Sequence, residues 1–392
     1  MKVLFMSNIN HQYRAGLFTS VTNRTEHMIK NYISNYESLS LINTDNRFSK
    51  ILKKILKKDL SDPITKSFYC NGILYKYIVN RNNIIRVLLR KLFPKYIKYE
   101  FLQLLSSIEI NQYDLIQAHW AYPVGYIAKS LKDKYDIPYV LTVHGSDIHT
   151  LPYKNKKIKK CVIEALESAN KVIFVSDNLL DIAKSIGYSG NNSVIIQNGV
   201  DLNLFNILNK KEIKKQLDIT CKVVGFVGNL IDVKRAEILP DIFESIKENY
   251  KNVEFMVLGD GNLKSKIVDQ CMKKQLKVRF LGHVNQCQVP YYINAMDVLI
   301  LPSRAEGFPS VVIEANACGV KVVGSNASGI PEAVGRFGEI INEGRDFEEK
   351  FSRKVVDVLK SDYNSEELRN RTLEFKWEYI SAREIEVYKS MF

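Results

Sequence analysis

The amino-acid sequence alternates short apolar runs with longer stretches in which apolar residues recur every three or four positions. The short runs predict buried β-strands, and the longer stretches predict helices that cover them. Six strands are predicted in the first half of the chain, at residues 2–6, 39–42, 115–118, 139–143, 172–175 and 194–196. Between them, helical spacing is clearest over residues 121–132 and 157–168. Strands that alternate with helices in this way are typical of a mostly parallel sheet.

The same alternation starts again near residue 223. Five more strands are predicted there, at residues 223–227, 253–258, 278–281, 298–301 and 321–323. Two successive series predict an α/β protein with two doubly wound, Rossmann-like domains, in which ligands bind beyond the carboxyl ends of the strands. A polar, lysine-rich stretch at 203–222 marks the seam. We therefore expect an N-terminal domain over residues 1–203, a C-terminal domain over 204–375 and a terminal helix over 376–392.

One segment of the first domain stands out by its charge. The chain has a formal net charge of +13, and residues 47–100 carry 14 Lys or Arg residues against three acidic ones. Two helical patterns in this segment, at 48–58 and 84–95, place apolar residues on one face and basic residues on the other. Basic amphipathic helices bind the interface of anionic membranes. The alternative is that both helices pack on the domain and expose their lysines. Nucleic acid is not expected as a partner, because no nucleic-acid-binding module is visible.

The composition narrows the class of protein and its compartment. With 46% hydrophobic and 25% charged residues, the 392-residue chain has the composition of a globular protein. No apolar run approaches the roughly 20 residues that span a bilayer, and the first residues do not resemble a signal peptide. The six cysteines are scattered without a C-x-x-C pair, which argues against a disulfide framework and a zinc site. We expect no metal, and a cytoplasmic protein peripherally associated with the inner face of the cell membrane.

The stretch L-P-S-R-A-E-G-F-P-S-V-V-I-E-A-N-A-C-G, residues 301–319, combines a strand end, a tight loop and the start of a helix. The first-turn amides of a helix have no partners within it, so this arrangement can bind an anion. Glu306 in the loop and Glu314 about one turn into the helix can both face a ligand there. A carboxylate accepts hydrogen bonds from vicinal hydroxyls, which indicates a nucleotide-sugar site. On spacing alone, a solvated loop glutamate beside a helix-stabilising one is an equally good interpretation.

Other strand ends carry candidate ligand-binding residues. His144 follows the strand at 139–143 and precedes a glycine, so it can meet a ligand; a histidine satisfied by nearby backbone is the alternative. His119 has a similar position one strand earlier, where the purely structural interpretation is stronger. Lys234, in the loop after the strand at 223–227, can hold a diphosphate as a point charge. The glycine-bearing strand ends L-G-D-G and L-G-H-V can simply permit tight turns.

Taken in chain order, these motifs resemble those of the family-four retaining glycosyltransferases, which have the GT-B architecture. The resemblance covers most of the chain, and its specificity lies in the ordered set of motifs. The set is H-G-S-D, N-G-V-D, V-G-N-L…K, L-G-D-G, F-L-G-H-V and P-S-R-A-E-G-F-P-S-V-V-I-E-A-N-A-C-G. The resemblance implies two Rossmann-like domains that face a cleft, with a terminal helix that crosses back to the N-terminal domain. It favours the sugar-binding interpretation of Glu306 and Glu314.

The resemblance also implies roles for individual residues. Glu314 would bind the ribose hydroxyls of the nucleotide, Glu306 would contact the donor sugar, and His144 would lie near the reacting carbon. Lys234 would neutralise the departing diphosphate, so that no metal is needed. The backbone amides that would hold the diphosphate and the sugar hydroxyls belong to Gly307, Phe308, Ser310, Val311 and Val312. The loop that would lie beside the base comprises Gly282, His283 and Val284.

The chain departs from the family pattern at two places. The family usually has an arginine where this chain has Asn229, so one cationic donor to the diphosphate is missing. Arg235 stands where glycine is common, and it could supply part of the missing charge. The loop after the first strand often carries paired glycines near the phosphates, whereas here only Gly16 is present, so its role stays open.

The resemblance implies a retaining, metal-independent hexosyltransferase. It would take a UDP- or GDP-linked nucleotide sugar as donor and a glycolipid or oligosaccharide as acceptor, in the synthesis of a surface polysaccharide such as lipopolysaccharide or capsule. The motifs place no side-chain nucleophile, and domain closure would exclude water. Two alternatives stay open. One is a nucleotide-sugar 2-epimerase of the same architecture, and the other is a non-catalytic protein that binds anionic surfaces through its basic segment.

Overall fold

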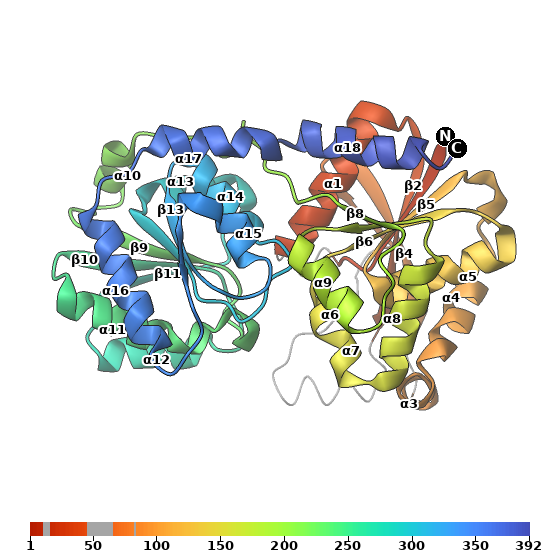
Figure 1. Ribbon diagram of the computed structural model, residues 1–392, viewed down its shortest axis with the longest axis horizontal. Helices are drawn as coiled ribbons and strands as arrows, with labels where there is room; N and C mark the ends of the chain where they lie inside the picture. Colours follow the sequence, from red (N-terminus) through yellow and green to blue (C-terminus); the bar gives the residue numbers. More distant parts are fainter. Residues whose placement is uncertain (11–15, 45–65, 82–83) are drawn as a thin grey trace. The chain divides into compact units, whose positions relative to one another are not determined.

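Both halves of the chain form a parallel β-sheet with helices packed against it, as the alternating pattern predicted (Figure 1). The structure, a computed structural model, describes residues 1–10, 16–44, 66–81 and 84–392. Most central strands are mainly apolar because helices cover both faces of a parallel sheet. In β6 (Tyr139–Val143) and β10 (Val253–Leu258) every residue is buried. The predicted α/β class with two Rossmann-like domains is confirmed.

The first unit comprises residues Met1–Gln197 and Ile380–Phe392. Its other strands are β1 (Lys2–Ser7), β2 (Asn35–Thr44), β3 (Ser67–Cys70), β4 (Ile73–Arg81), β5 (Leu115–His119), β7 (Lys171–Phe174) and β8 (Ser193–Ile195). Its helices are α1 (Gly16–Tyr32), α3 (Ile84–Leu92), α4 (Ile97–Leu105), α5 (Tyr126–Tyr135), α6 (Ser146–His149), α7 (Leu151–Lys154), α8 (Lys156–Ser168) and α9 (Asp177–Ser185). The last helix, α18 (Trp377–Lys389), contributes the residues from Ile380 onward.

The sheet of the first unit has the strand order β3-β4-β2-β1-β5-β6-β7-β8. All neighbouring strands are parallel except β3 and β4, which form an antiparallel hairpin. The hairpin turn is Asn71-Gly72, with φ values of 52° and 80°. Two consecutive positive φ angles are required in this kind of two-residue turn, and Asn-Gly is a favoured pair for it. The hairpin lies inside the basic segment and is absent from the predicted strands.

The second unit, Asn198–Tyr379, has the strand order β11-β10-β9-β12-β13-β14. Its other strands are β9 (Lys222–Val227), β11 (Val278–Gly282), β12 (Val298–Leu301), β13 (Lys321–Ser325) and β14 (Glu339–Ile341). Its helices are α10 (Lys210–Gln216), α11 (Leu239–Asn249), α12 (Lys264–Lys273), α13 (Val289–Ala295), α14 (Ser310–Ala317), α15 (Ile330–Val334), α16 (Phe347–Lys360) and α17 (Ser365–Arg371). This is the Rossmann strand order, whose direction reverses between β9 and β12 and places a ligand there.

One predicted helix is wrong in part. Residues 121–132 were expected to be continuous, but a wide turn (Ala121–Gly125) with an extended Tyr122 comes first, and regular helix starts only at Tyr126. The cause is Pro123, because a proline disfavours helical dihedrals at the residue before it. The helical pattern at 84–95 is borne out over α3, which ends at Leu92 before Pro94, whereas the pattern at 48–58 lies outside the described residues.

The units divide after Gln197 and after Tyr379, beside the predicted seam at 203–222 and the predicted start of the terminal helix. The domain limits 1–203, 204–375 and 376–392 stay a prediction. Across the part of the chain that the structure describes, no helix combines the length and the apolar character needed to cross a membrane.

Candidate nucleotide-sugar site

The loops after β9 and β12 meet at the point where the strand order of the second sheet reverses. The backbone amide of Arg304, in the second loop, donates to the carbonyl oxygen of Val233 in the first at 2.8 Å. Beside this contact, Lys234 Nζ and Glu306 Oε1 lie 2.5 Å apart. Their side chains are 22% and 12% exposed, so the ion pair is accessible to a ligand but largely out of solvent. The structure therefore brings together two of the predicted site residues, which are 72 positions apart in the chain.

Glu314 is the fifth residue of α14, in the element that follows the Glu306 loop. Its side chain keeps some accessible surface, yet so much protein surrounds it that burial raises the pKa of its carboxyl group to about 7. Burial is the whole cause, because no hydrogen bond or ion pair with a described residue offsets it. A carboxylate that is desolvated without a donor is costly, and such groups are concentrated at functional sites.

The backbone between the two glutamates forms a tight, buried loop. Gly307 and Phe308 are buried, and the amide of Gly329 donates to the carbonyl oxygen of Glu306 at 3.1 Å. The side chain of Asn198 donates to the carbonyl oxygen of Phe308 at 3.3 Å, a contact that the N-G-V-D motif gave no reason to expect. These contacts fix the shape of the loop without a ligand.

The start of α14 contains the other predicted amides. Ser310 and Val311 are partly exposed, whereas Val312 is buried. The amide of Val312 donates to the carbonyl oxygen of Pro309 at 3.0 Å, so it is already used within the turn. Gly319, which follows the helix, has a φ of 71°, the left-handed conformation that favours glycine after a helix end.

Arg235 and Asn229 lie in the loop after β9. Arg235 has a φ of 51°, a left-handed conformation that explains why glycine is common at this position. Its guanidinium group lies 2.6 Å from the carboxylate of Glu343 and 4.3 Å from the ring centre of Phe347. Asn229 is half-buried. In this state the charge of Arg235 is engaged by Glu343, so whether it replaces the arginine missing at Asn229 stays a hypothesis.

The glycines of L-G-D-G are required by close packing as well as by the turn. A Cβ at Gly259 would lie 1.9 Å from the carbonyl oxygen of Gly228, and one at Gly261 would lie 2.3 Å from that of Leu230. The loops after β9 and β10 are thus packed backbone against backbone. The amide of Gly259 also donates to the carbonyl oxygen of Gly282 at 2.8 Å, which fixes the start of the predicted base loop. In that loop His283 is exposed and Val284 is half-buried.

His144, in the first unit, follows β6 and is 7% exposed. Its ring lies 5.1 Å from the ring of Trp120, measured between centres, and its Nε2 atom is 3.0 Å from Nδ1 of His119. Asp147 accepts hydrogen bonds from the amides of His144 and Gly145 at 3.2 and 2.9 Å and so fixes the loop. Burial raises the pKa of Asp147, against the effect of these hydrogen bonds. His119, for which a structural role was the stronger expectation, is the partner of His144.

Gly16 is the first residue of α1, and residues 11–15 before it lie outside the described part of the chain. The structure therefore does not test the predicted phosphate role of this loop.

Two family models match the chain. The model described as Glycosyl transferases group 1 matches residues 209–375, and the model described as Glycosyltransferase Family 4 matches residues 70–204. The first match contains the loops of Lys234, Glu306 and Glu314, and the second contains His119 and His144.

Two relatives extend this likeness. An uncharacterized glycosyltransferase of Methanocaldococcus jannaschii is 31% identical over 303 residues, which are 73% of this chain and 78% of that protein. The putative teichuronic acid biosynthesis glycosyltransferase TuaC of Bacillus subtilis is 35% identical over 232 residues, 57% of this chain and 56% of TuaC. This chain therefore spans little more than half the length of TuaC.

The fold is shared with solved structures. The crystal structure of Anabaena HepE in complex with UDP-glucose has a TM-score of 0.74 with 20% sequence identity and covers 100% of both chains. Sucrose-phosphate synthase from Thermosynechococcus elongatus has a TM-score of 0.78 with 17% identity and covers 100% of this chain and 99% of its own. At these identities the likeness shows the fold alone.

Proposed function

Because this chain belongs to the family-four glycosyltransferases and has their GT-B fold, we propose that it is a retaining, metal-independent hexosyltransferase. Its donor is a UDP- or GDP-linked sugar, and its acceptor is a glycolipid or oligosaccharide in the synthesis of a surface polysaccharide. The observation that carries the proposal is the accessible Lys234–Glu306 pair, together with the carboxylate of Glu314 in the following helix, which has no partner among the described residues. The complex of HepE with UDP-glucose supports the type of donor, and the description of TuaC as a teichuronic acid biosynthesis glycosyltransferase supports a role in polysaccharide synthesis.

In the proposed reaction the bond between the anomeric carbon and the diphosphate oxygen breaks, and the acceptor oxygen bonds to the same face of that carbon. The acceptor proton passes to the departing diphosphate, whose negative charge grows as the bond lengthens. Lys234 leaves Glu306 and neutralises this charge, so that a metal is not needed for that purpose. Glu306 is then free to accept a hydrogen bond from a sugar hydroxyl, while Glu314 accepts hydrogen bonds from the ribose hydroxyls.

Donor-dependent nucleotide release tests the proposal. We expect the full-length protein, incubated with a panel of UDP- and GDP-sugars and membrane glycolipid extract, to release free nucleotide from one donor. Release should persist in EDTA, because the charge is neutralised by Lys234. A product that keeps its nucleotide but changes sugar configuration would assign the chain to the 2-epimerases instead. Absence of turnover with every donor would favour the non-catalytic alternative.

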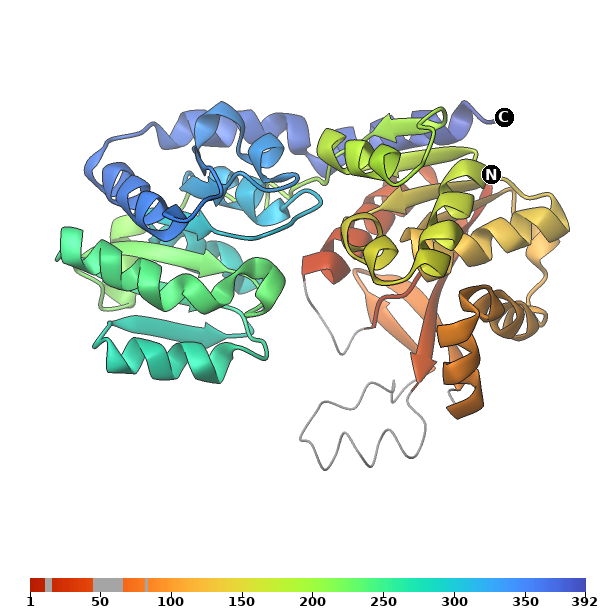
Figure 2. The ribbon, with the colours of Figure 1, turned by 60° about the horizontal axis from the view of Figure 1, so that its bottom comes forward.

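Helix α3 exposes its apolar face. Ile85, Leu88 and Leu92 are 69%, 54% and 48% exposed, and Phe93, which follows the helix, is 58% exposed. Their spacing of three and four residues places the helical ones on one side. Figure 2 shows α3 and α4, in orange, together at the edge of the first unit. Contiguous apolar surface of this kind marks an interaction site.

The basic residues of α3 divide between two directions. Arg86 and Arg90 face the protein, where they lie 3.7 and 3.4 Å from the buried carboxylate of Glu100 on α4. Lys91 is exposed beside the apolar face, whereas Lys95, which follows the helix, is exposed but pairs with Glu164 of α8 at 2.7 Å. The ion pairs with Glu100 hold the helix with its apolar side outward. This arrangement differs from the alternative in which the apolar face packs on the domain.

We propose that this face docks on an anionic membrane, where the glycolipid acceptor is found. The exposed side chains enter the lipid interface, and Lys91, Lys95 and the remaining charge of residues 47–100 attract the acidic head groups. The location is thus proposed as peripheral, at the inner face of the cell membrane. The six cysteines, all free, fit a reducing compartment.

Vesicle co-sedimentation tests the docking face. We expect the triple variant Ile85→Ser, Leu88→Ser, Leu92→Ser to bind vesicles of anionic phospholipid at least about tenfold more weakly than the wild type, because it loses the inserted apolar area. Met272 on α12, which is 69% exposed, offers a matched control: Met272→Ser should leave binding unchanged. Equal binding of wild type and triple variant would contradict the assignment.

A further inference from the structure

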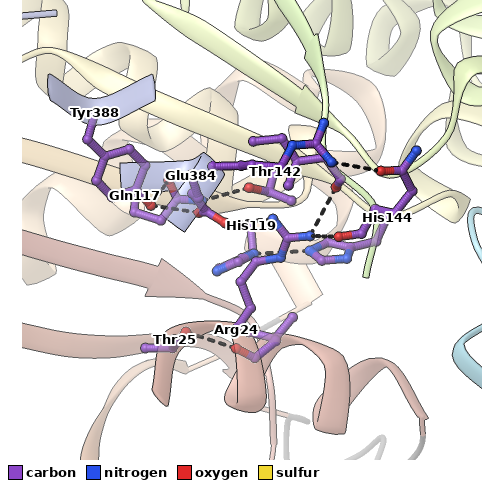
Figure 3. A network of polar contacts seen from close by, with 12 residues as sticks. Arg24, Thr25, Gln117, His119, Thr142, His144, Glu384 and Tyr388 are labelled. Atoms are coloured by element: carbon purple, nitrogen blue, oxygen red, sulfur yellow. Dashed lines mark hydrogen bonds and ion pairs between the residues drawn. The ribbon is translucent and has the colours of Figure 1, made fainter. Parts of the chain in front are cut away.

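Polar side chains of two neighbouring strands lie beside His144 on one face of the first sheet (Figure 3). Gln117 and His119 of β5 are two residues apart, as are Thr142 and His144 of β6 and its end, so each pair points to one face. The amide of Gln117 donates to the hydroxyl of Thr142 at 2.7 Å, and His119 Nδ1 lies 3.0 Å from His144 Nε2. The hydroxyl of Tyr388 on α18 lies 2.7 Å from the amide oxygen of Gln117. The histidine pair is therefore the outer layer of a network that reaches the terminal helix.

A buried ion pair lies beside this stack. Arg24 of α1 and Glu384 of α18 meet at 2.6 Å, with side chains 2% and 1% exposed. Arg24 also donates to the carbonyl oxygens of Ile196 and Gln197 at 3.1 and 2.9 Å, and Tyr388 donates to Glu384 at 2.8 Å. Buried ion pairs stabilise a fold little more than well-packed apolar residues do. The place of this pair beside the histidines therefore points to a role other than stability.

The two histidines are neutral, so one of them must donate the hydrogen bond between them and the other must accept it. Burial lowers the pKa of His119 to about 3 and that of His144 well below its usual range, and the charge of Arg24 adds to both effects. In a pair of neutral imidazoles, one nitrogen donates and the other accepts. Which one donates decides whether the other nitrogen of His144 is a donor or an acceptor toward a ligand.

The surroundings of His119 favour one arrangement. The side chain is 1% exposed, and among the described residues none accepts a hydrogen bond from its Nε2 atom. An N–H at Nε2 would therefore have no acceptor among the described residues, in a side chain that is almost wholly buried, which is costly. The positive charge of Arg24 also acts on this ring, and it disfavours an N–H group directed toward it.

We propose that Arg24 and Glu384 are positioning residues that fix the tautomers of this histidine pair. His119 carries its hydrogen on Nδ1 and donates it to His144 Nε2. His144 consequently carries its own hydrogen on Nδ1 and presents it to a hydroxyl oxygen of the ligand. The proposal rests on the proposed role of His144 in sugar binding, and it gives the terminal helix a part in the site through Glu384.

Nitrogen NMR of the full-length protein, labelled with 15N-histidine, measures the tautomers directly. The chain has six histidines, and the variants His119→Asn and His144→Asn assign the two signals. At pH 7 we expect both rings to show a protonated Nδ1 and a bare Nε2. A bare Nδ1 on His144, or a charged ring, would overturn the proposal. The measurement needs no substrate, so it stands even if the proposed enzymatic function fails.

Two substitutions at His119 separate donation from packing. The amide nitrogen of Asn can take the place of Nδ1, so His119→Asn should keep nucleotide release within about threefold of the wild type. His119→Leu has no donor and should lower release about tenfold or more, because His144 loses the partner that fixes its tautomer. Equal losses in the two variants would contradict the donor role of His119.

The ion pair is tested by removing both charges together, which avoids an unpaired buried charge. In Arg24→Met/Glu384→Met we expect the two nitrogen shifts of His144 to move toward average values, since both tautomers become populated. Lys129→Met, which removes a surface ion pair with Asp133 on α5, is the control and should leave them unchanged. Unchanged shifts in the double variant would remove Arg24 and Glu384 from the positioning role.

Discussion

Lys234→Ala is expected to lower kcat for nucleotide release about 100- to 1,000-fold. The loss of one preorganised cation or donor at a developing negative charge has an effect of this size. Lys234 is the cation that lies against Glu306 at 2.5 Å, at the sheet position where the diphosphate is proposed to leave. Steady-state kinetics with a saturating acceptor would measure the change, and kcat should fall more than KM rises.

Two further variants keep this prediction testable. Lys350→Ala removes an exposed lysine of α16 that pairs with Asp346, and its kinetics should equal those of the wild type. Lys234→Ala leaves the charge of Glu306 without a partner, which could destabilise the fold. The double variant Lys234→Met/Glu306→Gln avoids this because it removes both charges. If a folded variant without Lys234 keeps kcat within threefold, another group neutralises the diphosphate, and Arg235 is the first candidate.

Glu314→Gln is expected to reduce kcat/KM at least about 100-fold and, at the same time, to make the ligand-free protein more stable. The activity falls because the two hydrogen bonds from ribose hydroxyls lose their charged acceptor, at about 1.5–3 kcal/mol each. The stability rises because burial alone has raised the pKa of this carboxyl group from 4.5 to about 7. Each unit of that shift corresponds to about 1.4 kcal/mol, so the charged form costs the fold about 3 kcal/mol at most.

The sign of the pH dependence follows from the same shift. Between pH 4.5 and 7 the folded protein holds a proton on Glu314 that the unfolded chain releases, so stability falls as the pH rises through this window. At pH 8 Glu314→Gln should therefore melt at a higher temperature than the wild type, by on the order of 5 °C. At pH 5 the difference should be much smaller.

Saturating nucleotide gives the prediction a second control. It should raise the melting temperature of the wild type at pH 8 and have little effect on Glu314→Gln, which lacks the charged acceptor. A variant that melts earlier than the wild type at pH 8 would show that Glu314 has a stabilising partner in the fold.

Most of the fold could be predicted from the apolar runs, because a strand buried on both faces is mainly apolar. The runs at 139–143, 253–258 and 298–301 coincide with β6, β10 and β12. Strand β4 is different, since Lys76 and Asn80 interrupt it and it lies among basic residues. The Asn71-Gly72 pair is a turn signal for this hairpin, but the basic residues around it favour the pattern of amphipathic helices. The short β14, Glu339–Ile341, has three residues and no such signal.

The candidate residues of the second unit could also be predicted from the sequence. They belong to continuous motifs at the carboxyl ends of strands, which meet at one edge of a parallel sheet. The family prediction is confirmed by the Methanocaldococcus relative and the two family models. The support of His144 was not accessible. Arg24 and Glu384 are 360 positions apart, and neither lies in a motif. Only the packing of α18 on the first unit brings them together.

The left-handed backbone of Arg235 has a consequence for the mobility of its neighbour. A non-glycine residue in this conformation costs roughly 1–2 kcal/mol, and glycine would avoid that cost. In return, the guanidinium group joins the loop after β9 to Glu343 and Phe347, which follow β14 at the far edge of the sheet. The backbone that carries Lys234 is thereby held in place before any nucleotide arrives. Diphosphate binding should need a rotation of the lysine side chain and little ordering of the loop, so its entropic cost should be small.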